Sequence, residues 1–210
     1  MESLVDRYRT HDDPAGYFAA MYLGVTREVQ RGLAVGRFTN PEQLERLTVT
    51  FADRYLAAAS SESPPASWAV AFDAAADRSV TIVQHLLLGM NAHINLDLGI
   101  ACVEVAPGDA ITSIRRDFDE INDVLAELVD RVQASLSEVS WLYRFVDDVI
   151  DSEEDAVINF SIGRARAHAW QYAVELAAMQ PAEAAAKIER HDAVVAGLGR
   201  AIAHPPWWSR

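Results

Sequence analysis

The chain has 210 residues, and half of them are hydrophobic, which is enough to bury the core of one domain. Its 31 acidic and 18 basic residues give a formal net charge of −13, which excludes nucleic acid and anionic membrane surfaces as expected partners. The single cysteine, Cys102, excludes an internal disulfide and a multi-cysteine zinc site. The charged amino terminus lacks a hydrophobic run, so we expect a cytoplasmic protein.

Helical spacing of apolar residues recurs along the chain and predicts an all-α, single-domain bundle over residues 1–210. Residues 1–12 and 204–210 are expected to be a peripheral lead and tail. Asp13-Pro14 and Asn40-Pro41 each predict a helix start, because proline suits the first helical position. The serine- and proline-containing segment 60–65 predicts a loop. Further helices are predicted over Ser67–Ala76, Thr81–Cys102, Ile111–Leu136, Ser140–Asp151, Asn159–Met179 and 181–203.

The stretch Thr81–Cys102 (TIVQHLLLGMNAHINLDLGIAC) is apolar on nearly every side and contains no proline, which predicts a buried central helix. Its polar residues would be very costly in lipid, so we do not expect it to span a membrane. Buried polar groups need partners on neighbouring elements. At about 100° per residue they form two stripes. One contains His85, His93 and Asp97, and the other contains Gln84, Asn91 and Asn95.

The string HLLLGMNAHINLDL within this stretch resembles the signature of a bacterial domain family of unknown function. Residues 51–56 (FADRYL), 117–122 (DFDEIN) and 165–170 (ARAHAW) resemble secondary motifs of the same family. These segments are spread over most of the chain, so the resemblance is to a whole domain. It implies an all-helical protein and carries no known activity.

The polar stripe suggests a small-molecule enzyme that uses acid–base chemistry. His93 and Asp97 are four residues apart, so the carboxylate can orient the imidazole as in a catalytic dyad. We expect His93 to act as base, Asp97 to orient it, and His85 to serve as a second proton carrier. No nucleophile motif accompanies them, which favours an isomerase, a cyclase or a hydrolase that activates water. The expected substrate-binding residues are Asn91, Asn95, Arg54, Asn122 and Arg166, and either Arg54 or Arg166 is expected as a charge partner in the site.

A metal-assisted version of this site is a further hypothesis, and the sequence leaves the cofactor unknown. His85 lies two turns before His93, roughly 12 Å along the axis, so the two histidines do not bind one ion together. A metal would therefore need His93, Asp97 and a carboxylate from another helix, for which Asp117 is the expected residue. The usual di-iron and zinc helix motifs do not occur.

Two alternatives remain from other classes of protein. In the first, the chain is a non-catalytic helical protein for binding or dimerisation, and its polar residues form a buried hydrogen-bond network. A homo-oligomer is compatible with this alternative. In the second, Asp147, Asp148 and Asp151 resemble the acidic motif of class I terpene synthases, which implies diphosphate chemistry. In either enzyme hypothesis the expected partner is a small molecule, with no nucleic acid and no membrane.

Overall fold

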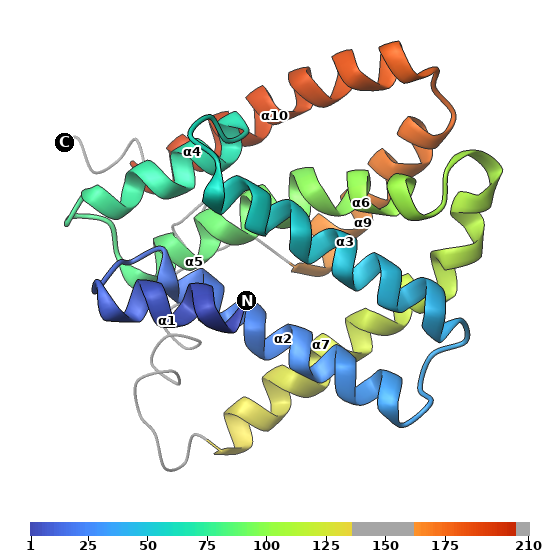
Figure 1. Ribbon diagram of the computed structural model, residues 1–210, viewed down its shortest axis with the longest axis horizontal. Coiled ribbons are helices and arrows are strands. Elements are labelled where there is room, and N and C mark those ends of the chain that lie inside the picture. The colour runs from blue at the N-terminus through green and yellow to red at the C-terminus, as the bar shows by residue number, and fades with distance from the viewer. Residues whose placement is uncertain (136–161, 205–210) are drawn as a thin grey trace.

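A computed structural model describes residues 1–135 and 162–204, except for the side chains of 129–135. Every regular element in this described part is helical, which confirms the all-α prediction. The helices enclose one long central helix that crosses the middle of the molecule (Figure 1).

The central helix is built from three consecutive segments. They are α5 (Ile82–Met90), the π-helical segment η2 (Asn91–Asp97) and α6 (Leu98–Val105). It begins with a capping box, in which Thr81 and Gln84 each accept a hydrogen bond from the other's backbone N–H. The helix is long and apolar enough to cross a membrane, but 83% of its most apolar window is buried in the protein. It is therefore packed as a core helix.

Helices from both halves of the chain cover the central helix. The elements that pack on it are α2 (Gly16–Ala34), α3 (Pro41–Ser60), α4 (Ala66–Asp73), α9 (Ile162–Ala177) and α10 (Pro181–Ala203). A short 3-10 helix, η1 (Ala74–Ala76), follows α4. Two glycines of the central helix permit close packing. A Cβ atom at Gly89 would lie 2.2 Å from Phe18 Cγ in α2, and one at Gly99 would lie 2.6 Å from Tyr172 Cδ1 in α9.

A 3-10 helix, η3 (Gly108–Ile114), leads into α7 (Arg115–Ser135), which packs against α2. Asp117 in the first turn of α7 is buried and accepts backbone hydrogen bonds from Thr39 N at 2.8 Å and Asn40 N at 2.7 Å. The Asn40 side chain in turn accepts from Gln43 N at 3.2 Å and caps α3. Asp117 therefore fastens the start of α3 to α7.

Two boundary predictions differ from the structure. Residues 1–12 were expected to be peripheral, but α1 (Glu2–Thr10) packs on α2 and buries Leu4 and Tyr8. These two residues are four positions apart and share one helix face, which is enough to anchor a short helix. The helix expected from Ile111 begins instead with the 3-10 turn η3. The helix predicted over Ser140–Asp151, residues 159–161 and the tail beyond 204 lie outside the described residues.

Candidate functional site

The site lies on the π-helical segment η2, where the winding departs from the uniform α-helix assumed for the sequence. A π-helix carries i→i+5 hydrogen bonds, so it changes which side chains share a face, and such segments are frequent at functional sites. His191 Nε2 lies 2.8 Å from the backbone oxygen of Asn95, so this ring nitrogen is the donor. Asn91 Nδ2 donates to Val195 O at 2.9 Å, and Asn95 Nδ2 donates to Asn91 Oδ1 at 3.0 Å. The bonds from His191 and to Val195 fasten η2 to α10, and the bond between the two asparagines lies within η2.

His93 is buried within a group of aromatic rings. Its imidazole is parallel to the Phe51 ring, with a centroid separation of 3.5 Å, and meets the Tyr22 ring edge-on at 4.4 Å. Nδ1 lies 3.5 Å from Asp97 Oδ2, whereas Nε2 is buried and has no hydrogen-bond partner among the described residues. Burial lowers the pKa of His93 below its usual range, against the opposing effect of Asp97. The lowered pKa favours the neutral ring, and a neutral ring that donates from Nδ1 to Asp97 has its lone pair on Nε2.

Asp97 is 1% exposed and is held by donors from two other helices. Its Oδ1 accepts from Arg54 Nε at 3.0 Å, and its Oδ2 accepts from Trp68 Nε1 at 2.8 Å. Arg54 is one of the two arginines that the sequence left open as a charge partner, and its Nη1 pairs with Glu104 at 2.9 Å. A solvent-facing groove of about 540 Å³ passes Asp53, Arg54, Asp97 and Glu104. Asp97 therefore lies between the buried imidazole and this groove.

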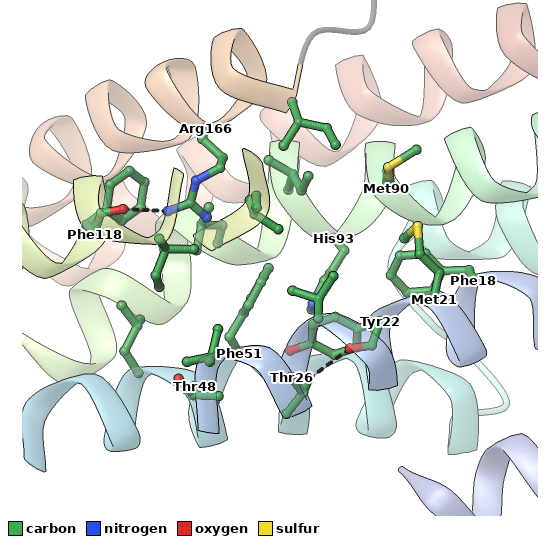
Figure 2. Close-up of a pocket in the computed structure, with 18 residues that line it drawn as sticks. Phe18, Met21, Tyr22, Thr26, Thr48, Phe51, Met90, His93, Phe118 and Arg166 are labelled. Atoms are coloured by element: carbon green, nitrogen blue, oxygen red, sulfur yellow. Dashed lines mark hydrogen bonds between the residues drawn. The ribbon is translucent and has the colours of Figure 1, made fainter. Parts of the chain in front are cut away.

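A second, mostly apolar cavity of about 110 Å³ lies on the His93 side of the central helix. Figure 2 shows Arg166 and His93 reaching toward this space from one side, with Phe51, Tyr22 and Thr26 on the other. The remaining walls come from α2, α3, the central helix, α7 and α9. The apolar lining residues are Phe18, Met21, Val25, Val29, Leu47, Met90, Ile94, Leu98, Phe118, Ile121, Leu125 and Ile162.

Arg166 brings a positive charge into the wall of this cavity. It is 5% exposed, donates from Nε to Asn122 Oδ1 at 2.6 Å and donates from Nη2 to the Phe118 carbonyl at 2.7 Å. Its guanidinium carbon lies 4.4 Å from the centre of the Phe118 ring. Burial lowers the pKa of Arg166 to about 10, so the group is still charged at neutral pH. Within the described residues no carboxylate forms an ion pair with it.

The structure brings some of the predicted site residues together. His93, Asp97 and Arg54 form one connected group. Arg166 and Asn122 are hydrogen-bonded to each other, and Arg166 lines the same cavity as His93. These two groups come from four separate helical elements, η2, α3, α7 and α9.

Other predicted residues lie elsewhere. His85 is buried near the Tyr17 ring, with centroids 6.2 Å apart, and does not line the cavity. Asn91 and Asn95 were expected to bind substrate, but their side-chain amides form hydrogen bonds within the protein. Asp117, the expected third metal ligand, instead accepts a backbone hydrogen bond from the loop before α3. No three His, Cys, Asp or Glu side chains gather as a metal site in the part of the chain that is described. Asp147, Asp148 and Asp151 lie outside the described residues.

Several site residues were not identified from the sequence. Trp68 was predicted to be on a short helix, but its hydrogen bond to Asp97 has no sequence signal because the two residues come from different helices. Phe51 and Tyr22 follow the apolar spacing of the helices that begin near Pro41 and Pro14, and no role beside His93 was predicted for either. Their helical spacing alone identifies the faces but does not show that the two faces meet at one imidazole.

Comparison with known proteins identifies a family. A search of curated proteins and a search of solved structures each find no match to this chain. A family model, described as a family of unknown function (DUF5995), matches residues 1–205. This match agrees with the resemblance to a helical family of unknown function and covers both the central helix and the elements around it. The chain therefore belongs to the DUF5995 family, whose function is unknown.

Proposed function

We propose that this protein is a small-molecule enzyme of the isomerase or cyclase type, with His93 as its general base. The observation that carries the proposal is the state of the His93 side chain. It is a buried, neutral imidazole at the wall of an apolar cavity, with Nδ1 facing Asp97 and Nε2 unpartnered among the described residues. A histidine of this kind is prepared to accept a proton at Nε2 from a bound molecule.

The surroundings of His93 support a cycle of proton transfer. When Nε2 takes a proton from the substrate, the ring becomes an imidazolium, and the Asp97 carboxylate stabilises the new charge through Nδ1–H. Arg54 and Trp68 hold the carboxylate in place, so it does not need to reorganise. Nε2–H then returns the proton to a different atom of the same molecule. This sequence needs no nucleophile from the protein and moves a hydrogen from one atom of the substrate to another. In a cyclase, the electron pair left by proton removal forms the ring bond to an electrophilic atom of the same molecule, and the proton returns to the group that accepts the displaced electrons.

Deuterium exchange tests the proposal. The protein is incubated in D₂O with a set of small apolar carbonyl compounds and carboxylates, and NMR follows the loss of C–H signals. We expect at least one compound to exchange, and His93→Gln to slow that exchange by about 10²-fold or more. Asp97→Asn should also slow it, whereas His168→Gln, at an exposed histidine, should not. An absence of exchange across the set, or equal rates in folded His93→Gln, would refute the proposal.

The alternative of a non-catalytic binding protein is favoured by one observation. Asn91 and Asn95 are bonded to protein groups, and Gln84 Nε2 donates to Ile202 O at 2.8 Å. These amides hold the central helix to α10 and need no ligand. This alternative predicts that the cavity binds small molecules without any His93-dependent exchange. Under both functions, burial of the central helix supports a soluble, cytoplasmic protein.

A further inference from the structure

Arg166 is a buried cation whose charge is not neutralised by a protein carboxylate within the described residues. A buried charge is expensive unless it is paired, and protein structures normally supply the partner. Among the described residues the guanidinium donates to neutral acceptors only, the Asn122 amide oxygen and the Phe118 carbonyl, and it lies over the face of the Phe118 ring. These bonds engage Nε and Nη2 and leave Nη1 without a bond to a described residue.

The cavity beside Arg166 has the size and lining of a site for a small apolar molecule. Its volume of about 110 Å³ approaches that of an engineered apolar cavity of roughly 150 Å³ that binds benzene, so it has room for a short hydrocarbon chain. Most of its wall is hydrocarbon from residues such as Met21, Val25 and Leu98. None of the described lining residues is acidic, so an anion entering it meets no like charge.

We propose that this cavity binds a small apolar carboxylate, with the carboxylate at the Arg166 guanidinium and the hydrocarbon part against the apolar wall. A planar guanidinium matches a carboxylate, and Nη1, which has no bond to a described residue, is the donor that remains for it. A single cation in an otherwise apolar space favours a monoanion over a phosphate dianion. The inference deepens the proposed function, because it assigns the substrate class of the cavity that His93 lines.

Binding of hexanoate and hexanol to the intact protein tests this directly, since the two differ mainly in the charged head group. At pH 7, followed by NMR titration or calorimetry, we expect hexanoate to bind about tenfold or more tightly than hexanol. From propionate to hexanoate the affinity should rise by about fourfold per methylene and then level off as the cavity fills. Equal or tighter binding of hexanol by the wild-type protein would overturn the proposal, and this result requires no variant.

Variants locate the binding group. Arg166→Met keeps the length of the side chain without the charge, and we expect it to lose the preference for hexanoate while it still binds hexanol. Arg116→Met removes an exposed arginine of α7 and should leave the preference unchanged. Thermal melting checks that each variant is folded. A folded Arg166→Met that retains the preference would also overturn the proposal.

The same measurements separate this inference from the proposed function. His93→Gln should bind hexanoate within a few-fold of the wild-type protein, because the carboxylate is held by Arg166. If the protein prefers hexanoate and His93→Gln still exchanges substrate protons, the carboxylate site is supported and the role of His93 as general base is refuted. If exchange depends on His93 but the protein does not distinguish hexanoate from hexanol, the carboxylate site is refuted and the acid–base role of His93 is supported.

Discussion

The His93 imidazole lies flat against the Phe51 ring, with 3.5 Å between ring centroids and an interplanar angle of 5°. This contact joins the π-helical segment of the central helix to α3 and removes one face of the imidazole from water. Together with the edges of Tyr22 and Phe18, it explains why burial is the dominant effect on the pKa of His93. The same residue therefore contributes to both stability and the proposed chemistry.

The first prediction concerns the pH dependence of stability. The pKa of His93 is lowered from its ordinary value of 6.5, so below pH 6.5 the unfolded chain takes up a proton that the folded protein does not. The free energy of unfolding should therefore fall as the pH decreases below 6.5, by up to about 1.4 kcal/mol per pH unit for this group. Urea denaturation between pH 5 and 7.5 measures the slope, and His93→Gln should reduce it.

His85 has its pKa lowered by burial as well, so its variant is the matched comparison. His85→Gln should remove its own part of the slope and leave the part due to His93. A slope that is the same in the wild-type protein and in His93→Gln would contradict the assignment of a neutral, buried imidazole.

The second prediction concerns Arg54, which shields the buried Asp97 carboxylate. Arg54→Met removes the donor to Oδ1, and we expect the free energy of unfolding to fall by about 2 kcal/mol. The variant also removes a positive charge that lowers the pKa of His93, so this pKa should rise. Chemical denaturation and NMR titration of His93 measure the two effects. Glu104→Gln removes only the exposed partner of Arg54 and should change stability by less than about 0.5 kcal/mol.

The third prediction concerns the bond between Trp68 Nε1 and Asp97 Oδ2. Trp68→Phe removes this donor but keeps an aromatic ring beside Phe72, whose centroid lies 5.3 Å from that of Trp68. The loss of a hydrogen bond to a buried carboxylate should destabilise the protein by about 1.5–3 kcal/mol. In an Asp97→Leu background the same substitution should cost much less, because the acceptor is gone. Equal costs in both backgrounds would show that the bond is unimportant.

The fourth prediction compares two glycines within helices. A Cβ atom at Gly89 would lie 2.2 Å from Phe18 Cγ, so Gly89→Ala forces α2 and α5 apart and should cost about 1–3 kcal/mol. Gly24 lies within α2 and has no atom within 4 Å of an added Cβ, so Gly24→Ala should stabilise by about 0.5–1 kcal/mol. Thermal denaturation of both variants should give shifts of opposite sign. A stabilising Gly89→Ala would contradict the close contact.

The local sequence alone determined the helical fold and the burial of the central helix. Each depends on the periodicity of apolar residues, which local backbone geometry converts directly into a buried face. That Asp97 needs a donor from another helix was also predictable, because a buried carboxylate requires a partner. The sequence left Arg54 and Arg166 both open, and the structure shows that Arg54 is the one that pairs with it.

Only the tertiary structure decided which polar groups share a site. His85 lies near Tyr17 and does not line the cavity beside His93. The Asp117 carboxylate accepts hydrogen bonds from the backbone before α3, and Trp68 is the second hydrogen-bond donor to Asp97. Such contacts join helices that are far apart in the chain, and a periodic pattern within one helix contains no information about its partners. The cavity exists for the same reason, because its walls come from helices that meet only after folding.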